Sequence, residues 1–143
     1  GPYDTRNQLL RQYREQGVEF VVPLVTEDEI ARKGRHDLFD RYRHAGIDVV
    51  HMPIADLTSP PVESIRKLVR QVGPYLKAGA AMVVHCNAGV GRTATVVACL
   101  LATLNRLDGP AAVERVQALM ATQIIDSQKR VVLRYAAEPP PPL

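Results

Sequence analysis

The feature that most constrains this chain is an apolar strand joined by a glycine-containing loop to an almost wholly apolar helix. Residues 80–86 have the composition of a buried strand, and residues 93–107 have few polar side chains on any side of the predicted helix. A helix that is apolar all round is buried. We therefore expect this helix to lie at the centre of the fold, directly after the strand.

The rest of the chain alternates between strand and helix periods. Strands are predicted over residues 18–25, 47–54 and 80–86. Helices are predicted around residues 9–13, 38–45, 62–76, 93–107, 109–121 and 126–136, with Gly17 and Gly46 ending the first two and Asp108 capping the fifth. Strands separated by helices predict an α/β fold: a three-layer sandwich with a central, mainly parallel sheet flanked by helices.

Length and composition narrow the classes of protein to which this chain can belong. A chain of 143 residues predicts one domain, over residues 1–137, followed by a Pro-rich tail over residues 138–143 that cannot continue a helix. Two cysteines outside any C-x-x-C pair disfavour structural zinc and disulfide scaffolds. The chain has no long apolar run and no signal-like start, so we expect a cytoplasmic protein without a membrane partner. A net charge of +3 and the absence of Trp disfavour nucleic acid.

The loop of residues 85–93 carries the chemistry. A strand delivers Cys86, a tight turn follows, and Arg92 opens the apolar helix. Backbone amides of such a turn converge on one point, and the helix adds its positive end. Gly89 and Gly91 permit the dihedral angles that the turn needs, and Arg92 can hold two phosphate oxygens with its planar guanidinium. The sequence therefore predicts a phosphate site formed by residues 87–92 (Asn87, Ala88, Gly89, Val90, Gly91 and Arg92).

Cys86 lies at the floor of this predicted site. The amides, the helix terminus and Arg92 all favour the thiolate, which is the nucleophilic form. Attack on phosphorus would give a phosphocysteine, and Thr93 is placed to hydrogen-bond the sulfur when it leaves. A cysteine that ends a strand is more commonly a small buried hydrophobe, but the combination with two glycines and an arginine favours the catalytic interpretation.

These residues resemble the signature of cysteine-dependent protein tyrosine phosphatases. The pattern His85-Cys86-x-x-Gly89-x-Gly91-Arg92-Thr93 is similar to theirs, and the short chain resembles their dual-specificity branch, especially the cyclin-dependent-kinase-associated phosphatases. Further matching pieces are Leu24-Val25-Thr26, Gly46-Ile47, Pro53-Ile54-Ala55-Asp56 and Ala98-Cys99-Leu100-Leu101. The family's opening strands are missing or much shortened. The resemblance implies a protein tyrosine phosphatase-like fold and a catalytic domain over residues 1–137.

The resemblance also implies roles for residues outside the loop. Asp56 matches the family's general acid, and it follows a predicted strand whose carboxyl end meets the same edge of the sheet as Cys86. The alternative is that Asp56 only hydrogen-bonds its own turn. His85 is expected to orient the loop and to help keep Cys86 ionised. Gln128 matches a glutamine that positions the hydrolytic water in close relatives, although a solvated place in a first helical turn is the alternative.

We therefore expect a metal-independent enzyme, without a cofactor, that hydrolyses phosphotyrosine and phosphoserine or phosphothreonine in proteins. Its expected partners are a phosphoprotein substrate and, as a candidate, a protein kinase, and we expect a monomer. Alternatives are a phosphoinositide or RNA 5′-phosphatase, a non-catalytic phosphate-binding module, and a rhodanese-type sulfur carrier. Asn87, Ala88 and Val90 lack the extra positive charge that suits polyanionic substrates.

Overall fold

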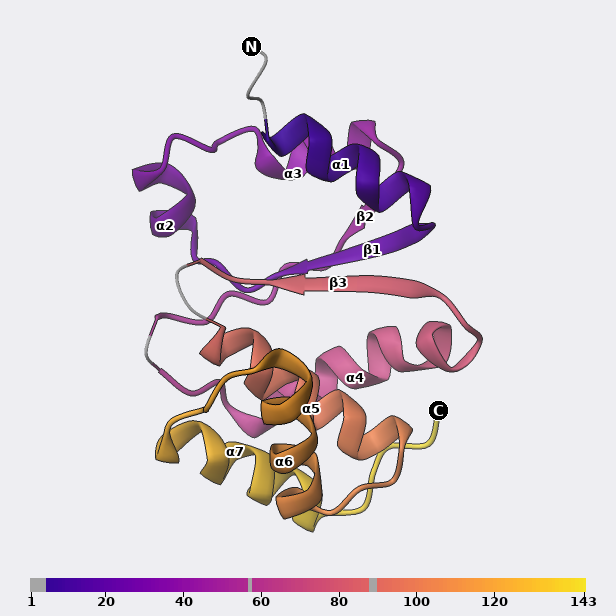
Figure 1. Ribbon diagram of the computed structural model, residues 1–143, viewed down its shortest axis with the longest axis vertical. Helices are drawn as coiled ribbons and strands as arrows, with labels where there is room; N and C mark the ends of the chain where they lie inside the picture. The colour runs from indigo at the N-terminus through magenta and orange to yellow at the C-terminus, as the bar shows by residue number, and fades with distance from the viewer. Residues whose placement is uncertain (1–4, 57, 88–89) are drawn as a thin grey trace.

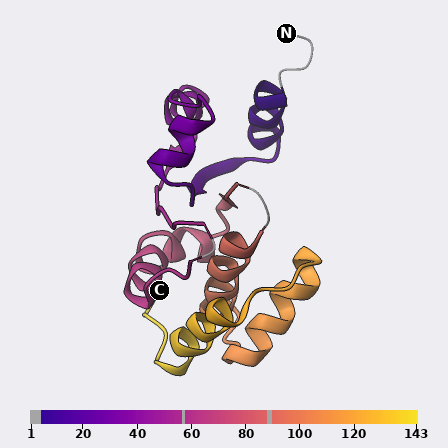
Figure 2. The same ribbon diagram turned by 90° about the vertical axis from the view of Figure 1, so that its left-hand side faces the viewer.

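The computed structural model describes residues 5–56, 58–87 and 90–143. Within these residues the chain forms three layers, with a parallel sheet between two groups of helices (Figures 1 and 2). The elements are α1 (Thr5–Glu15), β1 (Val18–Pro23), α2 (Glu27–Arg32), α3 (Leu38–His44), β2 (Asp48–Val49), α4 (Val62–Lys77), β3 (Ala81–His85), α5 (Gly91–Leu104), α6 (Gly109–Met120) and α7 (Asp126–Ala137). Helices α1–α3 cover one face and α4–α7 the other, which confirms the predicted sandwich.

The sheet has the strand order β2-β1-β3 in the part of the chain that the structure describes, and both pairings are parallel. The central strand β1 contributes Val21 and Val22, which are fully buried. The predicted strand 47–54 forms regular ladder pairs only over β2. Beyond it the amides of Val50, Met52 and Ile54 still donate to carbonyl groups along the β1 side, at 2.9, 3.1 and 2.9 Å. Parallel pairing therefore continues toward the carboxyl edge of the sheet.

Two hydrophobic clusters hold the layers together. The larger one joins α4, α5, α6 and α7 to the sheet and includes Leu24, Ile65, Val69, Val96 and Val132. The smaller one lies on the other face and contains Val18, Val21, Tyr42 and Ile47. Helix α5 is buried along most of its length, as predicted for the apolar helix, and it begins at Gly91 rather than at Thr93.

Helix caps explain where two of the helices begin. The Asp108 carboxylate accepts a hydrogen bond of 2.8 Å from the Ala111 amide, which confirms the predicted cap of α6. Helix α2 was not predicted, because six residues are too few to show a helical period. It is fixed by a capping box in which the side chain of Thr26 and the side chain of Glu29 each accept a hydrogen bond from the other residue's amide.

The Pro-rich tail folds back along the body. Helix α7 ends at Ala137, and Glu138 pairs with Arg66 at 2.8 Å. The chain then returns to α4, where Lys77 donates to the carbonyl of Leu143 at 3.3 Å and the Leu143 side chain packs against the larger core (Figure 1). Among the described residues, no helix has both the length and the apolar character needed to cross a bilayer.

Candidate active site

The predicted nucleophile lies where β3 meets α5. Cys86 directly follows the last residue of β3 and is half-buried, and Thr93 lies in the first turn of α5. The Thr93 hydroxyl donates a hydrogen bond of 3.0 Å to Cys86 Sγ. Of the residues predicted to bind phosphate, Ala88 and Gly89 lie outside the described residues. The Thr93 hydroxyl is therefore in place to stabilise negative charge on the Cys86 sulfur, as the sequence suggested.

Arg92 is buried and held from two directions. Its side chain is only 2% exposed. Two of its nitrogens donate to the two carboxylate oxygens of Glu29, at 2.6 and 2.9 Å, and one of them also donates to the carbonyl of Ile54 at 2.8 Å. This bidentate pairing fixes the plane of the guanidinium. The third nitrogen, Nε, lies 3.7 Å from the Asp56 carboxylate, so this edge of the guanidinium lies near the Asp56 loop.

Glu29 connects three segments that are far apart in the sequence. Besides Arg92, it accepts a hydrogen bond of 2.7 Å from the Asn87 side chain, and its capping interaction with Thr26 fixes α2. The hydrogen bonds from Arg92 lower the pKa of Glu29 from 4.5 to about 2, against the opposing effect of burial. The same pairing raises the pKa of Arg92. Both groups are therefore charged at neutral pH.

Glu29 was missed in the sequence, although a local signal for it exists. Thr26-x-x-Glu29 is a capping-box pattern and predicts the start of a helix. That pattern would have placed Glu29 in a first helical turn after a buried strand. It would not have identified Arg92 as the partner, because 63 residues separate the two.

His85 is half-buried and pairs with Tyr42. The Tyr42 hydroxyl lies 3.0 Å from His85 Nε2. Burial, with a smaller contribution from the positive charge of Arg35, lowers the pKa of His85 to about 4. Burial also raises the pKa of Tyr42, so its hydroxyl stays protonated and can donate to the imidazole. His85 is neutral at neutral pH, and any help that it gives Cys86 comes from hydrogen bonding rather than from a positive charge.

Asp56 lies on an exposed loop after the extended segment that follows β2. Its side chain is 53% exposed, and its carboxylate oxygen lies 3.7 Å from Arg92 Nε. The Thr58 hydroxyl donates to the carbonyl of Ala55, which closes a turn around Asp56. The structure thus brings Asp56 beside Arg92, as expected of a group that transfers a proton to a substrate held there.

Gln128 is buried beside the start of α5. It is 4% exposed, so the alternative of a solvated helix residue is wrong. Its side chain accepts a hydrogen bond of 3.2 Å from the Ile125 amide. A Cβ atom added to Gly91 would lie 3.1 Å from the Gln128 amide group, which shows how closely Gln128 approaches the backbone of the loop. Val90 and Ile125, which flank this contact, are both exposed apolar side chains.

The described residues contain no group of three or more His, Cys, Asp or Glu side chains that could hold a metal ion. The assembled side chains are instead a thiol, a hydroxyl, a guanidinium, a carboxylate and an amide: Cys86, Thr93, Arg92, Asp56 and Gln128. That set can bind a tetrahedral anion, attack it and exchange a proton with it.

Comparison with known families supports this chemistry. The sequence model of the family described as "Polymorphic toxin system, DSP-PTPase phosphatase" matches residues 3–105. The chain is 30% identical over 105 residues to cyclin-dependent kinase inhibitor 3 of Rattus norvegicus, covering 71% of this chain and 50% of that protein. It is 33% identical over 98 residues to the tyrosine-protein phosphatase cdc-14 of Caenorhabditis elegans, covering 68% of this chain and 12% of that protein.

Solved structures show the same fold. A kinase associated phosphatase (KAP) with its catalytic-site cysteine changed to serine has a TM-score of 0.79 and 24% identity, covering 90% of this chain and 76% of that chain. The active form of Tk-PTP has a TM-score of 0.79 and 26% identity, covering 92% and 85%. The chain spans about half the length of the rat relative.

Proposed function

This chain belongs to the DSP-PTPase phosphatases of polymorphic toxin systems, a family of cysteine-based phosphatases, and we propose that it dephosphorylates tyrosine and serine or threonine residues in proteins, through a phosphocysteine and without a metal ion. One observation carries the proposal: the Thr93 hydroxyl donates a hydrogen bond of 3.0 Å to Cys86 Sγ, and the residue just before Thr93 is the buried Arg92. A structural cysteine needs neither neighbour.

The first step transfers phosphate to the enzyme. The Cys86 thiolate attacks phosphorus, a sulfur–phosphorus bond forms, and the bond to the leaving oxygen breaks. Asp56 gives its proton to that oxygen, so the product leaves as an alcohol or phenol. The amides at the start of α5 and the Nε edge of Arg92 stabilise the charge on the equatorial oxygens.

The second step regenerates the Cys86 thiolate. Asp56, now a carboxylate, accepts a proton from a water that attacks phosphorus, and Gln128 orients that water. The sulfur–phosphorus bond breaks, and inorganic phosphate leaves. The electron pair returns to Cys86, where the Thr93 hydroxyl stabilises the thiolate.

The proposed substrates are phosphoproteins rather than polyanionic lipids. Asn87 and Val90, both near the start of α5, carry no positive charge for a second phosphate. Relatives named for a cyclin-dependent kinase make a protein kinase a candidate partner. We propose a shallow pocket that admits phosphothreonine as well as phosphotyrosine. We propose that the enzyme acts as a cytoplasmic monomer.

Hydrolysis of p-nitrophenyl phosphate in EDTA by the wild type and by Cys86→Ser tests the nucleophile. The wild type should be active, and the variant should bind phosphate but form no phosphoenzyme, because a serine hydroxyl does not ionise near neutral pH. Activity of the variant at neutral pH would overturn the assignment of Cys86.

Matched peptides that differ only in the phosphorylated residue test the substrate range. We expect measurable kcat/KM on phosphotyrosine and on phosphothreonine. A preference for phosphotyrosine beyond about 10⁴-fold, or about 5.5 kcal/mol in transition-state binding, would show a deep pocket and contradict dual specificity. Faster hydrolysis of a phosphoinositide than of either peptide would contradict the protein substrate.

A further inference from the structure

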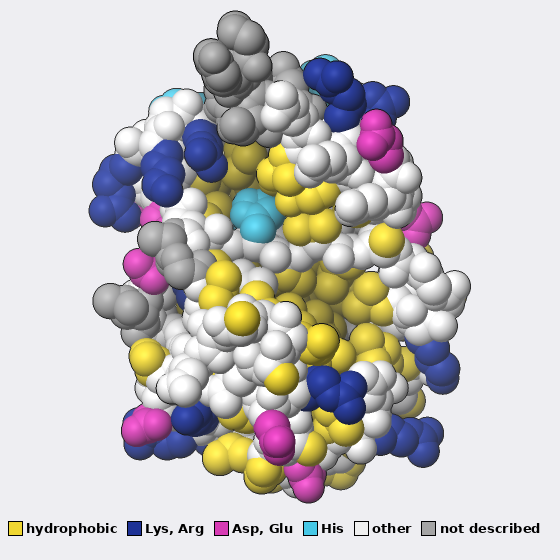
Figure 3. Space-filling view, in the orientation of Figure 1, with side chains coloured by type: hydrophobic (Ala, Val, Ile, Leu, Met, Phe, Trp, Pro, Cys, Tyr) yellow, Lys and Arg dark blue, Asp and Glu magenta, His cyan; other side chains and the backbone are white. Residues whose placement is uncertain are grey.

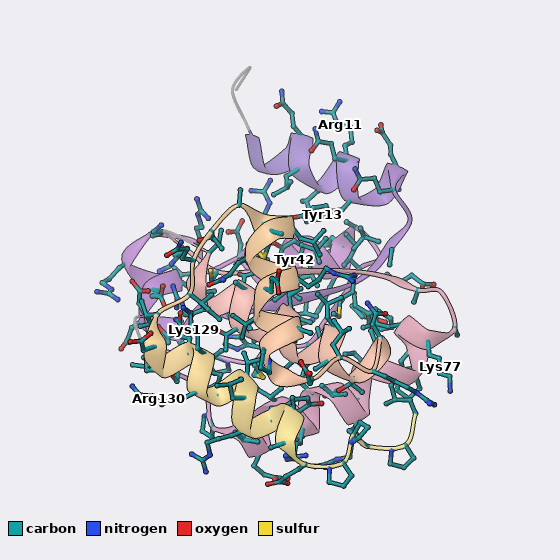
Figure 4. The ribbon with its side chains drawn as sticks, turned by 60° about the horizontal axis from the view of Figure 1, so that its bottom comes forward. Arg11, Tyr13, Tyr42, Lys77, Lys129 and Arg130 are labelled. Carbon is teal, nitrogen blue, oxygen red and sulfur yellow. The ribbon has the colours of Figure 1, made fainter. Side chains whose placement is uncertain are left out.

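A cavity of about 210 Å³ lies between α1, α3 and the beginning of the 85–93 loop. Most of its lining is apolar or aromatic, and two arginines complete it. Lining residues on α1 and α3 are Leu9, Leu10, Tyr13, Leu38 and Tyr42. Tyr13 of α1 points toward the sheet, and Tyr42 of α3 lies on the same side of α1 (Figure 4). In the upper half of the face shown in Figure 3, apolar side chains and a histidine line a hollow that has Lys and Arg side chains at its rim.

We propose that this cavity is a binding site for a small aromatic carboxylate, separate from the phosphate site, and that its occupancy changes the rate of the reaction at Cys86. The size of the cavity suits one ring. A dry apolar cavity of about 150 Å³ takes up benzene, so about 210 Å³ holds a ring with a short acidic arm. Leu9 lines the cavity and is 41% exposed, so the packing of α1 on this side of the sheet leaves room for a ligand.

The charge of the lining selects an anion. Arg35 and Arg41 line the cavity, and no lining residue in the described part of the chain is a carboxylate. Arg41 also pairs with Asp37, at 3.9 Å, so we assign the carboxylate of the ligand to Arg35. A guanidinium binds a carboxylate through two parallel hydrogen bonds. His85 is neutral and adds no competing charge.

The same cavity touches the proposed nucleophile. His85 and Cys86 both contribute to its wall, and the hydrogen bond between Tyr42 and His85 lies along it. A smaller cavity of about 40 Å³ shares Arg35, Leu38, His85 and Cys86 with it, and reaches Glu29 and Asn87. A ligand here therefore meets residues that position the loop, and we expect it to change kcat more than KM.

Binding is tested with phenylacetate in the presence of saturating inorganic phosphate, which keeps the phosphate site occupied. Titration calorimetry should show saturable binding at about millimolar concentration. Acetate lacks the ring and phenylethylamine has the opposite charge, so neither should saturate. The variant Leu9→Trp fills the cavity and should weaken binding by at least about tenfold. Leu119→Trp, on a side chain that is 66% exposed and outside the lining, is the matched control and should bind as the wild type does.

A second readout does not depend on a variant that folds. In methyl NMR spectra of the wild-type chain, phenylacetate should shift the signals of Leu9, Leu10 and Leu38 and leave Leu119 unchanged. Loss of phenylacetate binding in phosphate would place it in the phosphate site and overturn the proposal. Equal binding of phenylethylamine, or shifts confined to other leucines, would also overturn it.

Only the effect on rate rests on the proposed function. Phenylacetate should change kcat for p-nitrophenyl phosphate in the wild type and in Leu119→Trp, and not in Leu9→Trp. An inactive enzyme that still binds phenylacetate as described would refute the phosphatase proposal and leave the binding site standing. Unchanged kcat at saturating phenylacetate in an active enzyme would refute the coupling.

Discussion

Replacing Glu29 by Gln removes a buried charge and keeps the shape of the side chain. Glu29 is 8% exposed and accepts both hydrogen bonds of the bidentate pair with Arg92. A carboxyl whose pKa falls from 4.5 to about 2 on folding contributes about 3 kcal/mol at neutral pH. The variant also leaves the Arg92 guanidinium buried without its counter-charge. We expect Glu29→Gln to lower the free energy of unfolding by about 3 kcal/mol at pH 7.

The effect should depend on pH with a definite sign. A depressed carboxyl pKa stabilises the folded state fully above 4.5, and this contribution is lost as the pH falls toward 2. The difference between wild type and Glu29→Gln should therefore shrink from about 3 kcal/mol at pH 7 to less than half of that at pH 3. At low pH the free energy of unfolding of the wild type approaches that of the variant, because protonation of Glu29 removes the same charge.

Urea unfolding of both proteins at pH 7, 4 and 3 measures these differences. Glu63→Gln is the control, since Glu63 pairs with Arg70 at 3.3 Å on the surface with 77% of its side chain exposed. That variant should unfold as the wild type does. A Glu29→Gln difference below about 1 kcal/mol at pH 7, or one that stays constant down to pH 3, would refute the assigned role of the pair in stability.

Further outcomes concern the proton donor, the sulfur and the packing of α6. Asp56→Asn should lower kcat on a phosphothreonine peptide by about 10²–10⁴-fold and flatten the basic limb of its pH profile; an unchanged profile would assign the acid to another residue. Thr93→Val should slow alkylation of Cys86 by iodoacetamide at neutral pH by about tenfold or more, because a hydrogen bond to a charged group contributes about 1.5–3 kcal/mol; equal rates would remove the hydroxyl from the mechanism. Gly109→Ala should destabilise the fold by about 1–3 kcal/mol in urea, since its Cβ would lie 3.0 Å from the Leu133 backbone; wild-type stability would show that α7 moves freely.

Contiguous parts of the fold and the site could be predicted from the sequence. The strand before Cys86, the turn and the helix at Arg92 form one unbroken segment, so their spacing alone indicates the site. Burial periodicity likewise predicted α5 and α4. Groups from distant segments could not be predicted in the same way. Glu29 lies 63 residues before Arg92, in a helix of six residues, and only packing across the sheet brings the two together.

The charge state of His85 shows why residue type alone is a poor guide to electrostatics. A histidine before the nucleophile suggests a positive group that stabilises the thiolate, but burial under α3 and the field of Arg35 keep the ring neutral. The Arg92 charge is in turn balanced by Glu29. The ion pair with Glu29 therefore offsets the charge of Arg92, while the Thr93 hydroxyl and the amides at the start of α5 are dipoles fixed beside Cys86. Such dipoles act at short range and are little screened by salt, because they are fixed within the fold.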